Sequence, residues 1–190
     1  MEFAGEFDTT SKNLLAAYQN ELNAQASYKA FASKADEEGF GGLGSLFRAT
    51  ARAEQIHSNN QARALRQSGG EARADVVPMP VGATLDNLKA ALKGETYEIE
   101  VMYPKFAEQA SAHIHAQATR TFTQAMEAEK THAELFANAI AQIESRQAAS
   151  WVSTARDFHV CPMCAFTSEQ KVDSNCPVCG YPAERFEVVA

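Results

Sequence analysis

The chain has 190 residues, of which 45% are hydrophobic, and its formal net charge is −7 at neutral pH. This length allows one well-cored domain of ordinary size and a small additional module. The acidic balance argues against a nucleic-acid partner and against an anionic membrane surface, and no apolar run approaches the roughly 18 residues that a membrane-spanning helix needs.

The start of the chain gives an expectation about location. Residues 1–6, Met-Glu-Phe-Ala-Gly-Glu, contain neither the positive charge nor the apolar stretch of a secretory signal. We therefore expect a cytoplasmic protein, in which thiols stay reduced.

The first half of the chain predicts two helices joined by a tight reversal. Residues 11–38 are rich in helix formers with regularly spaced apolar residues. Glycines at positions 39, 41, 42 and 44 are expected to end this helix and to allow the reversal. The second helix runs from about Leu46 to Gln67, where Gly69-Gly70 stops it.

A long connecting segment and two further helices follow. Residues 71–82 include Val-Val-Pro-Met-Pro-Val, an extended linker because residues that precede proline avoid the helical region. Thr84 is the expected N-cap of a third helix that continues to about residue 112, and Pro104 should kink that helix locally. A fourth helix runs from roughly Ala116 to Glu144. The fold class is therefore an all-α, ferritin-like four-helix bundle with a long crossover between its second and third helices.

The two Glu-x-x-His motifs, Glu54/His57 and Glu129/His132, carry the main chemical signal. In each motif the two side chains lie one turn apart on a single helix face. Two such helices, each beside a glutamate-bearing neighbour, form a dinuclear iron or manganese site inside a four-helix bundle. Carboxylates with one imidazole per metal favour these two metals over copper or a structural zinc.

The neighbouring glutamates complete the predicted ligand set. We assign Glu54 and Glu129 as the carboxylates that bridge the two metals. The terminal ligands are then Glu21, His57, Glu95 and His132. Glu98 is a surplus carboxylate one turn from Glu95, which is most useful where coordination differs between ferrous and ferric iron.

The two halves of the bundle repeat each other. The offset is 74 residues from Glu21 to Glu95, and 75 residues from each member of the first Glu-x-x-His motif to the second. Tyr28 and Tyr103 are also 75 residues apart. Each helix pair should therefore contribute half of the metal site. The tyrosines either hydrogen-bond its carboxylates or are plain core aromatics.

All four cysteines lie near the end of the chain, as Cys161-Pro-Met-Cys164 and Cys176-Pro-Val-Cys179. Paired Cys-x-x-Cys knuckles in a reducing compartment predict a tetrathiolate metal site rather than disulfides. Its metal is zinc or iron, and a redox-active diiron site, which receives electrons singly, favours iron. We divide the chain into a bundle, residues 1–148, and a linker with the metal module, residues 149–190.

With these motifs in place, residues 8–188 resemble the rubrerythrin family, in which a ferritin-like diiron bundle precedes a rubredoxin-like module with one iron held by four thiolates. The motifs that carry the resemblance are Glu21 with Tyr28, Glu54-Gln-Ile-His57, Glu95-Thr-Tyr-Glu98 with Met-Tyr103-Pro-Lys-Phe, Glu129-Lys-Thr-His132, and the two cysteine knuckles, the second followed by Gly180-Tyr181. One departure is Ala165, because rubredoxin-like knuckles usually place glycine after the second cysteine. If this residue needs a left-handed backbone, alanine costs roughly 1 kcal/mol.

The resemblance implies a function. It implies reduction of hydrogen peroxide to water, protecting against oxidative stress, with electrons from an NAD(P)H-dependent reductase or a rubredoxin passing through the tetrathiolate iron to two irons in the bundle. It further implies that one iron exchanges His57 for Glu98 between the reduced and oxidised forms, and we assign catalytic roles to Glu98, His57, Tyr28 and Tyr103. Family members dimerise, often head to tail, with each cysteine module near the partner's diiron site.

Two other functions remain open. A ferroxidase or iron-storage protein of the same superfamily would oxidise many ferrous ions per subunit and would give the cysteine module no obvious task. A non-enzymatic protein would use the module as a zinc ribbon for protein contacts and the bundle as a scaffold.

Overall fold

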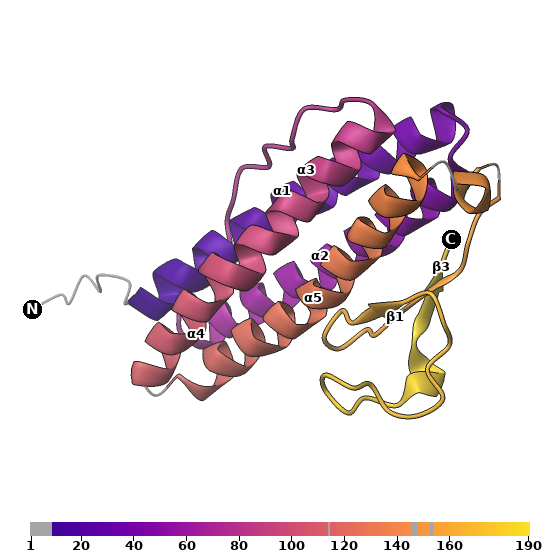
Figure 1. The fold of residues 1–190 in the computed structure, drawn as a ribbon. Helices are drawn as coiled ribbons and strands as arrows, with labels where there is room; N and C mark the ends of the chain where they lie inside the picture. The colour runs from indigo at the N-terminus through magenta and orange to yellow at the C-terminus, as the bar shows by residue number, and fades with distance from the viewer. Residues whose placement is uncertain (1–8, 114, 146–147, 153) are drawn as a thin grey trace, which may run out of the picture.

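The computed structural model describes residues 9–113, 115–145, 148–152 and 154–190, so the expectation for residues 1–6 lies outside it. Four helical rods form a bundle, and a small β module lies along one side of it (Figure 1). None of the helices in these ranges is long and apolar enough to cross a membrane. The rods are α1 (Thr9–Glu37), α2 (Gly41–Gln67), a third rod of several pieces, and α5 (Ala116–Glu144).

The second helix begins earlier than predicted. Gly41, Gly42 and Gly44 lie inside its first turns, and only Gly39, at φ +83°, makes the reversal. Close packing explains the glycines within the helix. A Cβ on Gly42 would lie 3.1 Å from Arg156 Cδ, and one on Gly44 would overlap the Asp36 carboxylate. These glycines therefore serve tertiary contacts rather than the turn.

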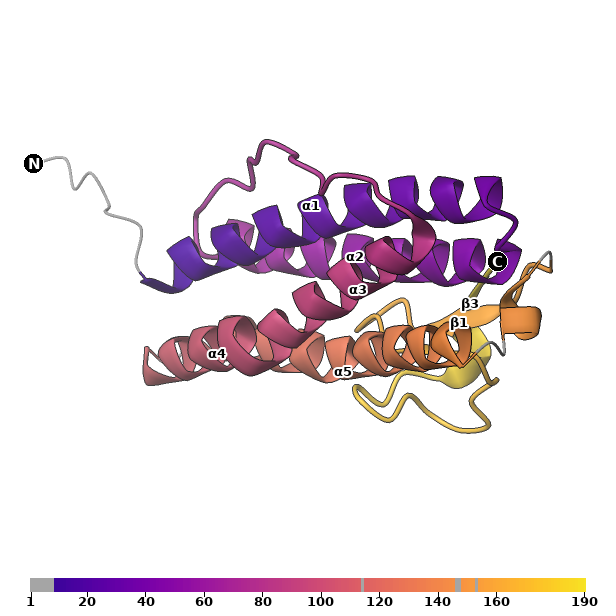
Figure 2. The ribbon, with the colours of Figure 1, turned by 45° about the horizontal axis from the view of Figure 1, so that its top comes forward.

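The crossover between α2 and α3 has no regular secondary structure, as predicted, and lies along α1 (Figure 2). Side chains one helical turn apart on α1 hold it. Gln19 donates to the Asp75 carbonyl, Asn23 accepts from Val77 N–H at 2.7 Å, and Ser27 accepts from Met79 N–H at 2.8 Å. Residues four apart on a helix advance about 6 Å, close to the span of two extended residues, so the pairs stay in register.

The third rod consists of α3 (Thr84–Tyr97), the π-helical segment η1 (Glu98–Met102) and α4 (Tyr103–Ala112). The N-cap prediction for Thr84 is wrong. Ala83 is the N-cap, Thr84 is the first helical residue, and its N–H donates to the Glu38 carboxylate at 3.0 Å. The distant carboxylate thus replaces a local cap.

The predicted irregularity near Pro104 takes the form of η1, where Tyr103 N–H donates to the Glu98 carbonyl five residues back. A π turn accommodates one extra residue. This accounts for the change of offset between the halves: Glu21 to Tyr28 spans seven residues, whereas Glu95 to Tyr103 spans eight. Glu98 therefore lies where the third rod changes its winding.

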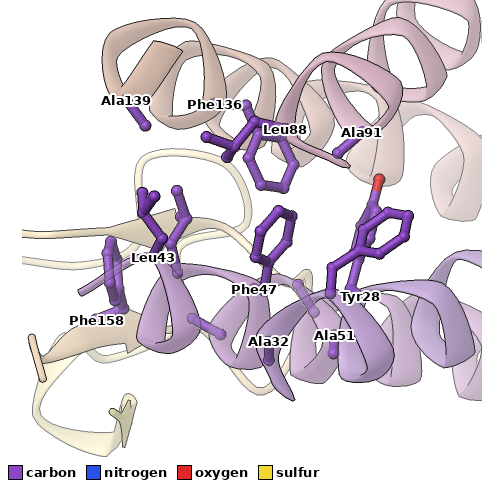
Figure 3. Close-up of a cluster of buried hydrophobic side chains, with 14 of the residues drawn as sticks. Tyr28, Ala32, Leu43, Phe47, Ala51, Leu88, Ala91, Phe136, Ala139 and Phe158 are labelled. Carbon is purple, nitrogen blue, oxygen red and sulfur yellow. The ribbon is translucent and has the colours of Figure 1, made fainter. Parts of the chain in front are cut away.

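An aromatic cluster packs the bundle at the end nearest the α1–α2 turn (Figure 3). The Phe47 ring lies 5.5 to 6.2 Å from the rings of Phe31, Phe136 and Tyr28, measured between centroids. Burial of such large apolar side chains is the main stabilising contribution in a bundle of this size.

The C-terminal module is a three-stranded antiparallel sheet of order β2-β1-β3, with β1 at Phe158–Val160, β2 at Thr167–Ser168 and β3 at Glu187–Val189. It is preceded by the 3-10 helix η2 (Ala148–Trp151) and contains a second one, η3 (Ala183–Arg185).

The module packs on the bundle of its own chain. Phe158, Val160 and Ala165 are fully buried in the same apolar cluster as Leu43 of α2, and Figure 3 shows Phe158 beside Leu43. Arg52 of α2 adds a two-pronged ion pair with Glu187, at 2.6 and 2.8 Å. The division of the chain at residue 148 stays a prediction.

Candidate metal centres

The bundle interior gathers the predicted ligands from all four rods. One group comprises Glu21, Glu54, His57 and Glu129, and the other Glu54, Glu95, Glu129 and His132. Within each group the potential ligand atoms lie within 4.8 Å of one another. The two groups share Glu54 and Glu129, which is the arrangement expected of carboxylates that bridge two metals. Each group has one histidine and one further glutamate of its own.

The seventh predicted ligand stands apart from the six. Glu98 is buried but belongs to neither group. Its Oε1 accepts a hydrogen bond of 2.6 Å from Asn20 Nδ2, and its Oε2 has no hydrogen-bond partner. The structure therefore brings six of the seven side chains together and places the surplus carboxylate beside them.

The carboxylates leave unpaired oxygens that fit bound cations. Five of them each have one buried oxygen without a hydrogen-bond donor: Glu21, Glu54, Glu95, Glu98 and Glu129. An ionised carboxylate in an apolar interior is very unfavourable unless a positive charge compensates it. Carboxylate and imidazole donors together suit iron or manganese, so the residues present fit a dinuclear centre of this kind.

The pKa values of the buried groups show how unfavourable the charged carboxylates are in the absence of metal. Burial, followed by the charge of neighbouring glutamates, raises the pKa of four carboxyls well above the ordinary value: Glu21, Glu54, Glu98 and Glu129. Burial lowers the pKa of His57 to about 4, so this imidazole is neutral at neutral pH. Metal binding at this site therefore has to displace protons from carboxyls.

Both histidines are oriented by the cysteine module. His57 Nε2 lies 3.2 Å from the carbonyl of Cys164, and His132 Nε2 lies 3.1 Å from that of Ala165. A carbonyl can only accept, so each Nε2 carries a proton, and Nδ1 is the nitrogen of each ring that faces the carboxylates and is available to a metal. The first cysteine knuckle thereby fixes the orientation of both imidazole rings.

The two tyrosines hydrogen-bond the carboxylates in a reciprocal pattern. Tyr28 of α1 donates to Glu95 at 2.5 Å, and Tyr103 of α4 donates to Glu21 of α1. Each half of the repeat thus supplies the donor for the other half's glutamate. Of the two interpretations left open by the sequence, these two hydrogen bonds favour tyrosines that bind the carboxylates over plain core aromatics.

Sequence reasoning missed two polar residues at the site. Gln61 is fully buried and donates to both Glu21, at 3.1 Å, and Tyr103, at 2.8 Å. Its position seven residues after Glu54, on the face that carries the ligands, is a signal that could have found it. Asn20 gives no such signal, because only the fold brings it to Glu98.

The four cysteines form the second centre. Cys161 Sγ lies 3.6 Å from Cys179 Sγ, and Cys164 Sγ lies 3.5 Å from Cys176 Sγ. A disulfide requires about 2.05 Å, whereas metal–sulfur bonds of about 2.3 Å in a tetrahedron separate the sulfurs by about 3.8 Å. All four cysteines are free, so the geometry fits a tetrathiolate ion.

Comparison with known proteins agrees with both centres. The family model described as Rubrerythrin matches residues 12–140. The chain belongs to the rubrerythrin family. It is 33% identical to Rubrerythrin-2 of Clostridium acetobutylicum, over 94% of this chain and 95% of the relative, and 33% identical to Nigerythrin of Nitratidesulfovibrio vulgaris, over 94% and 85%.

Solved structures support the same assignment. The fully reduced, all-ferrous state of nigerythrin superposes with a TM-score of 0.84 at 32% identity, over 97% of this chain and 89% of that one. A bacterioferritin from Desulfovibrio desulfuricans, at 21% identity and a TM-score of 0.72, shares the bundle fold. As a member of the rubrerythrin family with these two clusters, the protein is an oxidoreductase with two iron ions in the bundle and one at the cysteines.

Proposed function

We propose that this rubrerythrin-family protein is a peroxidase that reduces hydrogen peroxide to water, H2O2 + 2 H⁺ + 2 e⁻ → 2 H2O. Electrons enter from an NAD(P)H-dependent reductase, or from a rubredoxin that it reduces, at Cys161, Cys164, Cys176 and Cys179. In the bundle, Glu54 and Glu129 would contribute to both iron positions, Glu21 and His57 would hold one iron, and Glu95 and His132 would hold the other.

The chain's own groups prepare the site for this reaction. When bound, the iron pair supplies one electron from each ion and acts as a Lewis acid towards the O–O bond. The bundle keeps the carboxylates buried, and Tyr28 and Tyr103 fix the orientation of Glu95 and Glu21. In the oxidised form Glu98 would replace His57 as a ligand of one iron.

The observation that carries this proposal is the docking of the first cysteine knuckle on His57. The hydrogen bond from His57 Nε2 to the Cys164 carbonyl joins a ligand of one centre directly to a ligand residue of the other. A ferroxidase would have no use for this connection, whereas a peroxidase has to be re-reduced one electron at a time. Because the contact lies within one chain, a head-to-tail dimer is not needed to bring the centres together. A homodimer and a cytoplasmic location stay predictions.

Stopped-flow reoxidation tests the proposal. The anaerobically reduced, iron-loaded protein is mixed with equal concentrations of H2O2 or O2, and the visible absorption of the ferric centres is followed. We expect reoxidation by H2O2 to be much faster. Equal rates, a preference for O2, or oxidation of many ferrous ions per subunit would favour a ferroxidase instead.

The Glu98→Ala variant tests the exchange of ligands directly. We expect peroxide turnover to collapse while the first two irons still bind, because the six clustered ligands are unchanged. Glu100→Ala is the matched control, since Glu100 lies on the same rod but is exposed. Wild-type turnover by Glu98→Ala would contradict the exchange of ligands.

The visible spectrum separates the zinc alternative. Ferric iron in four thiolates absorbs intensely in the visible range, whereas zinc is colourless. Protein purified from iron-replete cells should therefore show these bands, and a colourless module that stays folded would support a zinc ribbon.

A further inference from the structure

A cavity of about 210 Å³ lies between α1, α3 and the crossover, with Glu98 in its wall. Polar side chains of α1 and residues of the crossover form most of the remaining wall. The residues that line it are Asn20, Asn23, Ala24, Ser27, Tyr28, Val77, Met79, Gly94 and Glu98. Its volume exceeds that of several water molecules, which occupy about 30 Å³ each in the liquid, so a carboxylate side chain has room to move there.

The cavity lies where the repeat between the two halves breaks down. The offset of 74 residues that relates Glu21 to Glu95 also relates Asn20 to Gly94 and Ala24 to Glu98. The last two pairs, Asn20 with Gly94 and Ala24 with Glu98, line the cavity. One half therefore supplies the surplus carboxylate and the other half supplies the amide that binds it. The small residues at the two equivalent positions, Ala24 and Gly94, leave the space open.

Asn20 and Glu98, the two larger residues among these four, are in direct contact. Asn20 Nδ2 donates to Glu98 Oε1 at 2.6 Å, and the other carboxylate oxygen has no hydrogen-bond partner. Neighbouring polar residues of α1 have a different task, because Gln19, Asn23 and Ser27 hold the crossover. Asn20 has no such bond to the crossover among those that the structure shows, so its amide is directed to Glu98.

We propose that Asn20 is a positioning residue that holds Glu98 away from the iron pair in the form in which His57 is the ligand, and that the cavity is the space which Glu98 then occupies. The inference rests on the proposed exchange of His57 for Glu98. In the structure His57 lies within a ligand group, with its Nδ1 2.7 Å from Glu129, and Glu98 is outside both groups, which is the arrangement expected where His57 is the ligand. Without the amide, Glu98 should bind iron more readily and so stabilise the oxidised form.

Potentiometric titration of the diiron centre tests this role. A hydrogen bond to a charged group contributes enough to shift the equilibrium of Glu98 by about tenfold. For Asn20→Ala we therefore expect a midpoint potential lower by about 30 mV for a two-electron couple. Asn20→Asp, which keeps the side-chain size and places a carboxylate beside Glu98, should shift it further in the same direction, and it serves if the alanine variant folds poorly.

Two further variants separate the outcomes. Gln19→Ala is the matched control, because Gln19 is adjacent on α1 and contacts the crossover but not Glu98 or the cavity. It should leave the potential unchanged. In a Glu98→Ala background, Asn20→Ala should have no further effect, because the two residues act as a pair.

Each remaining result has a distinct meaning. If Glu98→Ala changes the potential but Asn20→Ala does not, Asn20 has no positioning role and the proposed function stands. An equal shift by Asn20→Ala with and without Glu98 would also overturn the role, since Asn20 would then act by another route. If Glu98→Ala changes neither the potential nor peroxide turnover, the ligand exchange itself is wrong.

Discussion

Replacing Ala165 with glycine tests how the cysteine module is held on the bundle. The two knuckles are equivalent in their backbone: Ala165 N–H donates to the Cys161 carbonyl and Gly180 N–H to the Cys176 carbonyl, both at 2.9 Å. Both residues have a left-handed backbone, with φ of +69° and +75°. The strain expected from the sequence at Ala165 is therefore present.

The surroundings of the two positions differ. No atom lies within 4 Å of a Cβ built on Gly180, so Gly180→Ala adds backbone strain of about 1–2 kcal/mol. It also regains about 0.4–1 kcal/mol by restricting the unfolded chain. We expect a net loss of about 1 kcal/mol in the free energy of unfolding, as the difference of these two contributions.

Ala165→Gly reverses the strain but removes a methyl group that is fully buried against the bundle. Losing that methyl costs about 0.8 kcal/mol, and the more flexible unfolded chain costs about 0.4–1 kcal/mol. These losses cancel the relief of about 1–2 kcal/mol. We therefore expect stability within about 0.5 kcal/mol of the wild type, as the difference of those contributions.

Guanidinium unfolding of the iron-loaded variants measures both effects. The ferric–thiolate absorption reports on the module and far-ultraviolet circular dichroism reports on the bundle. A gain of about 1 kcal/mol in Ala165→Gly, which is the relief of strain less the cost of the more flexible unfolded chain, would show that the methyl contributes nothing to docking. A neutral Gly180→Ala would refute the assumed strain.

The site and its helices support three further predictions. The metal-free protein should lose stability as the pH rises above the ordinary range of a carboxyl pKa, because the carboxyls whose folded pKa is raised stabilise the fold below their ordinary pKa and lose this effect as they ionise. Thermal unfolding should show the decline in the metal-free protein but not in the iron-loaded one. Tyr28→Phe should weaken metal binding about 10-fold by freeing Glu95, and a competition titration with a chelator that showed no change would contradict this. Gly94→Ala should raise the free energy of unfolding by about 1 kcal/mol, since a Cβ there meets only Tyr28 Oη at 4.0 Å; a lower melting temperature would show that the cavity cannot accept the methyl.

Helical periodicity allowed much of the bundle to be predicted. The fourth helix has the predicted bounds, Ala116–Glu144, and the six side chains that lie together in the bundle are among the seven whose spacing predicted a metal site. Both results depend on local geometry, because residues three or four apart on a helix share a face whatever surrounds them. The errors lie where distant groups take over, as at Thr84, whose N–H is capped by Glu38.

The sequence by itself therefore determined the ligand types, the helix faces that carry them and the four-cysteine cluster, since each is written in short-range spacing. Only the tertiary structure decided that the module's carbonyls orient His57 and His132, that Asn20 binds Glu98, and that glycines begin α2 for packing. These contacts join residues far apart in the chain, and their geometry depends on how whole helices pack. No local pattern of residues encodes it.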